Sequence, residues 1–296
     1  MDASPPLPWL QPADLARHLA GSDVPWTLLD ARFDLMDPAA GERSFDEGHV
    51  PGAQYLHLEH HLSRPRTALD GRHPLPVRGT AAAQFAALGV DQGRTVVVMD
   101  AGNALYASRA WWMLRELGHP DVRVLSGGFA AWQRAGLTVA TGPAAAPVPG
   151  RFTASDSPAA GFVSVDADTL WAALQGGRAA ALDARAPERF AGLTEPIDPV
   201  AGHIPGARNL PYAELLAADG TLLPPEQLRA RIGDALAGQP AESAVLYCGS
   251  GVTACALHLA FTTAGLAGAA GPRIYAGSWS EWCRQPGRPV ATGAAG

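Results

Sequence analysis

Cysteine and long apolar runs are both scarce in this chain of 296 residues. The three cysteines, Cys248, Cys255 and Cys283, are too few and too unevenly spaced for a disulfide framework. Together with the nine histidines they form no metal-ligand spacing, so we expect no metal centre. The most apolar stretch, residues 254–271, is interrupted by threonines, glycines and a histidine, which favours a buried helix over a membrane span.

Charge of one sign is not concentrated anywhere along the chain. The 22 basic and 28 acidic residues give a net charge of −6, and no block of like charges indicates a nucleic-acid surface. The N-terminal residues include no basic side chain and no apolar segment of signal-peptide length. We therefore expect a cytoplasmic protein without nucleic-acid or membrane partners. An anionic substrate would need a local positive site, because the overall field opposes it.

The chain contains an internal duplication. Four blocks of the first half return in the same order in the second half, at offsets of 148 to 154 residues. The pairs are LLDAR (28–32) with ALDAR (181–185), GHVPGA (48–53) with GHIPGA (202–207), VVVMDAGN (96–103) with AVLYCGSG (244–251), and RVLSGGFAAW (123–132) with RIYAGSWSEW (273–282). Residues 141–162, rich in Pro, Ala and Gly, are typical of a linker. The sequence therefore predicts domains at 1–140 and 163–296.

Short apolar runs alternate with helical patterns in each half. In the second half, the apolar runs at 180–184 and 243–247 are separated by the helical pattern of residues 224–236. Such alternation requires crossover connections and favours a parallel sheet with helices on both faces. We expect an α/β fold made of two similar domains.

The segment AVLYCGSGVTACALHL (244–259) carries the strongest functional signal. An apolar strand ends at Tyr247 and a helix begins near Thr253, so Cys248 lies in a tight turn at the carboxyl end of a parallel strand, where such sheets bind ligands. Gly249 and Gly251 allow successive N–H groups to point inward, and the helix start adds its positive dipole end. A thiol held there is expected to be a reactive thiolate. A free cysteine after a strand is otherwise usually just a small buried residue.

These motifs together resemble the rhodanese superfamily, and specifically the 3-mercaptopyruvate sulfurtransferases, over nearly the whole chain. The resemblance rests on GHVPGA and GHIPGA, on DAGNALYASRAWWMLRELGH (100–119), on CGSGVTA (248–254) and on GSWSEW (277–282). It implies two rhodanese-like domains, each a parallel β-sheet flanked by helices. Only the second is expected to be catalytic, because Asp100 occupies the position of the nucleophile in the first, and a carboxylate cannot carry a transferable sulfur.

The resemblance also implies a reaction. Cys248 would take a sulfur atom from a small-molecule donor, 3-mercaptopyruvate, as a persulfide, and pass it to cyanide or to a thiol acceptor such as thioredoxin or a low-molecular-weight thiol. No cofactor is expected. The substrate-binding residues would be the loop residues Gly249, Ser250, Gly251, Val252 and Thr253, together with Arg189 for the substrate carboxylate.

Two further features follow from the resemblance. The family's serine–histidine–acid relay corresponds to Ser250, His73 and Glu59, with Glu59 in place of the usual aspartate. A second substrate arginine, which the family carries after an EP pair, is missing here, and Ile197 lies in that region. The lost contact would be worth about 1.5–3 kcal/mol.

Other functions remain open on these residues. Thiosulfate sulfurtransferases share the intermediate but usually carry basic residues after the cysteine, where this chain has Gly249 and Ser250. A non-catalytic sulfur-relay or interaction scaffold fits Asp100 better than it fits the intact CGSGVT loop. A cysteine phosphatase is excluded, because Thr253 and Ala254 stand where a loop-closing arginine would be needed.

Overall fold

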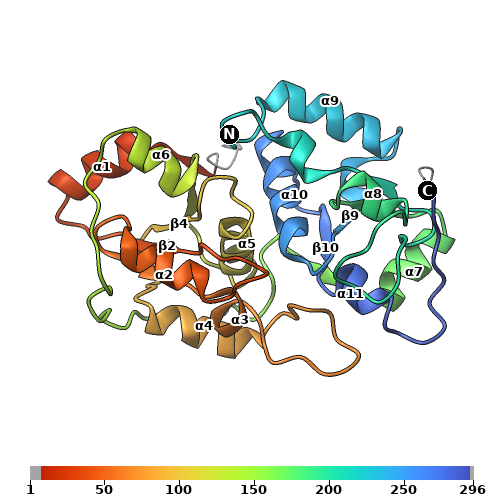
Figure 1. Ribbon diagram of the computed structural model, residues 1–296, viewed down its shortest axis with the longest axis horizontal. Helices are drawn as coiled ribbons and strands as arrows, with labels where there is room; N and C mark the ends of the chain where they lie inside the picture. Colours follow the sequence, from red (N-terminus) through yellow and green to blue (C-terminus); the bar gives the residue numbers. More distant parts are fainter. Residues whose placement is uncertain (1–7, 294–296) are drawn as a thin grey trace.

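The computed structural model describes residues 8–293, which form two α/β units side by side (Figure 1). Each unit contains a five-stranded sheet in which all the paired strands are parallel. The first sheet has the order β1-β5-β4-β2-β3 and the second the order β6-β10-β9-β7-β8. The strands are β1 Trp9–Leu10, β2 Thr27–Asp30, β3 Ala53–Tyr55, β4 Val96–Met99, β5 Val122–Leu125, β6 Ser164–Val165, β7 Ala180–Asp183, β8 Arg208–Asn209, β9 Ala244–Tyr247 and β10 Arg273–Tyr275. The two orders are equivalent, so the expected duplication and fold class are confirmed.

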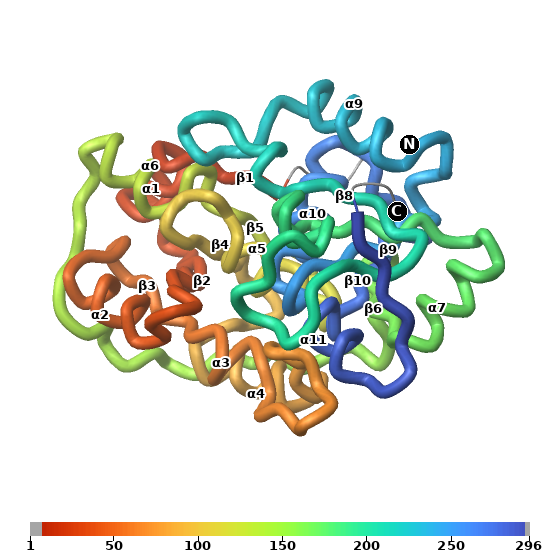
Figure 2. Tube along the Cα trace, turned by 45° about the vertical axis from the view of Figure 1, so that its right-hand side comes forward, coloured from red at the N-terminus to blue at the C-terminus, as the bar shows by residue number. Residues whose placement is uncertain are grey.

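Helices cover both faces of each sheet (Figures 1 and 2). The first unit contains α1 Pro12–Gly21, α2 Ala40–Glu47, α3 Leu58–His61, α4 Arg78–Ala87, α5 Ala107–Glu116 and α6 Gly128–Arg134. The second contains α7 Ala167–Gln175, α8 Pro187–Phe190, α9 Pro225–Leu236, α10 Val252–Thr263 and α11 Ser278–Trp282, with short 3₁₀ helices at Tyr212–Leu215 and Ala241–Ser243. Every residue of β2, β4, β7 and β9 is buried, which explains the uninterrupted apolar sequences of β4 and β9. Strands β2 and β7 each end in a buried aspartate, Asp30 and Asp183.

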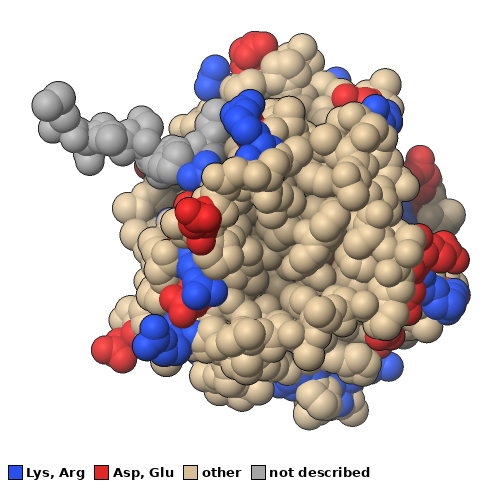
Figure 3. Space-filling view, turned by 90° about the vertical axis from the view of Figure 1, so that its left-hand side faces the viewer, with Lys and Arg blue, Asp and Glu red and all other residues tan. Residues whose placement is uncertain are grey.

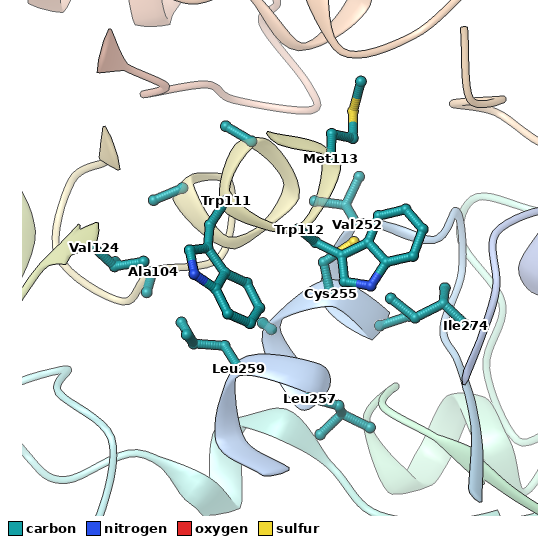
Figure 4. Packing of buried hydrophobic residues seen from close by; sticks show 14 of the residues in the cluster. Ala104, Trp111, Trp112, Met113, Val124, Val252, Cys255, Leu257, Leu259 and Ile274 are labelled. Carbon is teal, nitrogen blue, oxygen red and sulfur yellow. The ribbon is translucent and has the colours of Figure 1, made fainter. Parts of the chain in front are cut away.

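The two units share one apolar core, in which α5 of the first packs against α10 of the second. Trp111 and Trp112 of α5 lie against Cys255 and Leu259 of α10 (Figure 4). Helix α10 is apolar on nearly all sides because it is buried between the sheets. Among residues 8–293, the structure has no helix long and apolar enough to span a bilayer.

The segment between the two sheets lies along the surface of the first unit. Gly150 donates its N–H to the carbonyl of Ala86, and Gln92 donates to the carbonyl of Arg151. Phe152 and Phe162 are buried in the shared core. The division into 1–140, 141–162 and 163–296 stays a prediction. Residues of both units line the pocket that contains Cys248.

Candidate active site

Cys248 follows β9 directly, and the turn after it leads into α10. Gly251 has φ +82°, and a Cβ at this position would lie 2.3 Å from the carbonyl oxygen of Ala276, so a side chain is excluded there. This tight turn brings the N–H of Gly251 to 3.2 Å from Cys248 Sγ. The sulfur therefore receives a backbone hydrogen bond at the start of a helix, as the glycine spacing predicts.

Residues at the start of α11 form hydrogen bonds with the backbone of the loop that contains Cys248. The N–H of Cys248 donates to Ser278 Oγ at 3.1 Å, while Trp279 and Ser280 donate their N–H groups to the carbonyls of Cys248 and Gly249, both at 2.9 Å. Ser278 is fully buried and has φ +54°, a conformation stabilised here by its two side-chain hydrogen bonds. The GSWSEW block is thus the support of the loop.

The loop opens into a cavity of about 340 Å³ between the two units. Arg72, His73 and Tyr106 of the first unit line it opposite Cys248 and Arg189 of the second. On the face of the first unit drawn in Figure 3, acidic and basic side chains are interspersed around a wide uncharged area. The cavity itself is lined by three arginines, Arg72, Arg185 and Arg189, which offer positive charge to an anionic substrate.

Ser250 and His73 meet across the boundary between the units. His73 Nδ1 lies 3.0 Å from Ser250 Oγ, and both residues are buried. Arg109, fully buried in α5, donates from Nη2 to the carbonyl of His73 at 2.9 Å and to that of Leu62 at 3.2 Å. Burial, together with the neighbouring arginines Arg109, Arg72 and Arg66, lowers the pKa of His73 to about 3. The imidazole is therefore neutral at physiological pH.

Glu59 makes no hydrogen bond with this pair, and its part in the expected relay stays a prediction. It lies exposed on α3, where its N–H donates to Nδ1 of the N-cap residue His57. Among the described residues no hydrogen bond connects its carboxylate with His73. The physical reason is the direction of the short helix, which places Leu58 against the cavity and Glu59 toward solvent. The groups that act on His73 are arginines rather than an acid.

Arg189 reaches the cavity from α8. Its Nε and Nη2 donate to Glu195 at 3.2 and 2.7 Å, and Nη2 also lies 3.5 Å from Asp198. Within residues 8–293, its Nη1 makes no hydrogen bond. The guanidinium is therefore anchored on one side and has donors available on the other.

Arg72 is the residue that the sequence analysis missed. A Cβ at Gly249 would lie 2.6 Å from Arg72 Nη2 and 3.6 Å from both Nη atoms of Arg189, so two guanidinium groups stand over Gly249. Arg72 also forms an ion pair with Asp198 of the second unit. A second guanidinium therefore lies beside Arg189 at the loop, although Ile197 stands in the region where the resemblance implies an arginine. The only signal in the sequence was its position beside His73 in DGRHPLP.

The corresponding loop of the first unit is filled by its own side chain. Asp100 is buried and accepts hydrogen bonds at 2.9 to 3.2 Å from the N–H groups of Gly102, Ala104, Tyr106 and Ala107. These are the donors that would otherwise be free to bind a ligand. The first unit therefore has no open anion cradle at this loop.

The other two cysteines differ from Cys248 in their surroundings. Cys255 is fully buried on α10, and its thiol donates to the carbonyl of Gly251 at 3.3 Å. Burial raises the pKa of Cys255 to about 12, so it is a neutral thiol at physiological pH. Cys283 is half-buried, and burial raises its pKa as well. Neither residue lines the cavity that Cys248 faces.

Arginines shared by the two halves have the same structural role in both. Arg185 pairs with Asp183 and donates to the carbonyl of Gly202. Arg32 pairs with Asp30 and donates to the carbonyl of Gly48 in the same way. These contacts connect the end of β2 in the first unit, and of β7 in the second, with the proline turn that follows.

Comparisons with known proteins agree with this arrangement. The family model for the rhodanese-like domain matches residues 11–135 and 166–285. A "Probable 3-mercaptopyruvate sulfurtransferase" from Pseudomonas aeruginosa is 48% identical over 281 residues, or 94% of this chain and 96% of the relative. A "Putative thiosulfate sulfurtransferase" from Mycobacterium tuberculosis is 39% identical over 292 residues, or 96% of each chain. The structure of 3-mercaptopyruvate sulfurtransferase from Leishmania major superposes with a TM-score of 0.79 at 32% identity, over 93% of this chain and 74% of that one.

Proposed function

This chain belongs to the rhodanese-like family, with the domain present twice, and from this premise we propose that it transfers sulfur from 3-mercaptopyruvate through a persulfide on Cys248 to a thiol acceptor. That it is a sulfurtransferase follows from its close relatives, whose names nevertheless contain different donors. The choice of donor must therefore be argued from the site. The observation that carries the proposal is the position of the Cys248 thiol between a serine–histidine pair and two arginines with free donors.

Donor binding depends on charge and shape. The substrate carboxylate would lie between Arg72 and Arg189, whose free Nη atoms both face Gly249. Two guanidinium groups can share one carboxylate, each with a charge-assisted hydrogen bond. A side chain at Gly249 would displace Arg72 Nη2 from this position. The backbone from Gly249 to Thr253 forms the floor of the cavity.

Sulfur transfer then needs a nucleophile and a place for the developing negative charge. The Cys248 thiolate attacks the donor sulfur, a new S–S bond forms, and the C–S bond of mercaptopyruvate breaks. Its electron pair becomes the enolate of pyruvate, and the proton of the donor thiol ends on the methylene carbon to give pyruvate. Cys248 remains as a persulfide anion next to the N–H of Gly251.

Ser250 and His73 act on the carbonyl oxygen of the donor in this mechanism. With Nδ1 protonated, neutral His73 donates to Ser250 Oγ and leaves the serine O–H free for the oxygen on which the enolate charge grows. Because its pKa is about 3, His73 orients the serine as a neutral hydrogen-bonding group rather than as an imidazolium. This account needs no contribution from Glu59.

The second half-reaction regenerates the enzyme. A thiol such as thioredoxin or a small thiol, or cyanide, attacks the outer sulfur, and Cys248 leaves as the thiolate. The first domain contributes Arg72 and His73 but no second nucleophile, because its loop is filled by Asp100. A cytoplasmic setting, which suits both thiol acceptors and a reactive cysteine, stays a prediction.

Thiosulfate is the alternative donor, and the pair of arginines over Gly249 is the observation in its favour. Against it, both arginines are already partly neutralised by Glu195 and Asp198. The positive charge left on the two arginines would therefore neutralise a monocarboxylate better than a doubly charged donor. We expect a higher kcat/KM for mercaptopyruvate than for thiosulfate with the same acceptor.

The proposal is tested by treating the protein with mercaptopyruvate and measuring its intact mass. The mass should rise by one sulfur atom located on Cys248, and Cys248→Ser should abolish both the mass increase and the release of pyruvate. Cys255→Ser is the matched control, since it is seven residues away on α10, and it should retain both. Sulfur located on Cys255 or Cys283 instead would refute the assignment.

A further inference from the structure

We infer that Asp198 sets the charge of the donor site and thereby selects a singly charged donor over a doubly charged one; this inference rests on the proposed function. Asp198 lies in the loop after α8, and its side chain is completely buried. It is close to Ile197, where the resemblance called for a second arginine. The chain thus has a buried acid in the region where a base was expected.

Asp198 is contacted by three arginines from separate parts of the chain. Arg72 of the first unit pairs with its Oδ1, Arg284 beyond α11 approaches the same oxygen at 3.2 Å, and Arg189 lies 3.5 Å from Oδ2. Its own N–H donates to Glu195 Oε1 at 3.1 Å, which fixes the backbone. The carboxylate therefore holds the two substrate-facing arginines, Arg72 and Arg189, against each other across the domain boundary.

The ion pairs around Asp198 form a group with a small net charge. Asp198, Glu195 and Asp183 contribute three negative charges, and four arginines contribute the positive ones. The arginines are Arg72, Arg185, Arg189 and Arg284. These seven residues carry one net positive charge, the Cys248 thiolate and the donor not included.

A change of one charge at Asp198 affects the two donors unequally. At a given distance, the Coulomb energy of a dianion with that charge is twice the energy of a monoanion. The effect is poorly screened by salt, because the carboxylate is buried. Loss of the arginine anchor would weaken binding of both donors, and of the dianion more, so it would lower the thiosulfate-to-mercaptopyruvate ratio of kcat/KM. Removal of the negative charge of Asp198 would raise that ratio, so the sign of the change separates the two effects.

The test compares three variants with the unmodified enzyme, using both donors and one acceptor. In Asp198→Asn, which keeps the size and removes the charge, the thiosulfate-to-mercaptopyruvate ratio of kcat/KM should rise about tenfold, mainly through KM. Asp198→Glu keeps the charge and should leave the ratio within about twofold of the original. Arg284→Gln changes the local charge in the opposite direction, and the ratio should fall.

Each outcome bears on the inference. An unchanged ratio in Asp198→Asn, or a change of the same sign in Asp198→Asn and Arg284→Gln, would overturn it, because a loss of packing alone could produce either result. If Asp198→Asn does not fold, Arg284→Gln tests the inference by itself. A thiosulfate-to-mercaptopyruvate ratio of kcat/KM that stays constant or rises in Arg284→Gln would then refute it. The sulfur-labelling experiment on Cys248 separates the two proposals. With Cys248 labelled and the ratio constant, only the role of Asp198 is wrong, whereas an unlabelled Cys248 removes the proposed function and this inference with it.

Discussion

Replacing Arg72 with glutamine tests whether the first domain supplies part of the donor site. The guanidinium is largely buried, with 11% of its side-chain surface exposed, and its Nη2 faces Gly249 in the cavity. A carboxylate bound there would lose one charge-assisted hydrogen bond, which is worth about 1.5–3 kcal/mol. Since 1.4 kcal/mol corresponds to a factor of ten, kcat/KM for mercaptopyruvate should fall by about 10- to 150-fold.

The loss should appear mainly in KM. The carboxylate keeps its charge throughout the reaction, so Arg72 stabilises the bound donor and the transition state about equally. Pyruvate release, followed with lactate dehydrogenase and NADH over a range of donor concentrations, gives kcat and KM separately. Circular dichroism of the same samples checks that the fold is retained.

Arg284→Gln is the matched control for this experiment. Arg284 contacts the same oxygen of Asp198 as Arg72 does, but it does not line the cavity. Its replacement should therefore change kcat/KM for mercaptopyruvate by no more than about threefold. Equal losses in the two variants, or a loss in Arg72→Gln confined to kcat, would show that Arg72 does not bind the carboxylate.

Two more outcomes can be checked. Ile197 lines the cavity, and Ile197→Arg should lower KM for thiosulfate more than KM for mercaptopyruvate, because Arg72 and Arg189 already serve a single carboxylate; a larger gain for mercaptopyruvate would contradict this. Burial lowers the pKa of His73 to about 3 and that of His258 to about 4, from an ordinary value of 6.5, so the unfolded chain binds more protons between these values. The free energy of unfolding should then decrease as pH falls below about 6.5, by about 1.4 kcal/mol per pH unit for each histidine. Urea denaturation at pH 7, 6 and 5 measures this, and His73→Gln should remove the part due to His73, which lowers the slope by about 1.4 kcal/mol per pH unit. An unaltered slope in that variant would refute the assignment.

The fold and the cysteine loop could be predicted from the sequence because both depend on local pattern. Uninterrupted apolar runs such as residues 96–99 and 244–247 are buried on both faces, which requires helices on each side of a parallel sheet. Gly251 is needed for a left-handed backbone conformation that brings its N–H to Cys248 Sγ. Such requirements involve residues close together in the chain, so the duplication and the position of Cys248 were evident from the sequence.

The charged walls of the site were decided by tertiary structure alone. Arg72 reaches Gly249 and Asp198 only because the apolar surfaces of α5 and α10 pack the two domains together. Glu59 is exposed on the short helix α3, although its spacing after the PGA block resembled that of a relay acid. Ion pairs between residues more than 100 positions apart leave no pattern in the sequence. The partner of a charged side chain is decided by which residues lie beside it in the folded protein. The sequence therefore predicted Cys248 as the nucleophile, and the docking of the two domains determined which charges surround it.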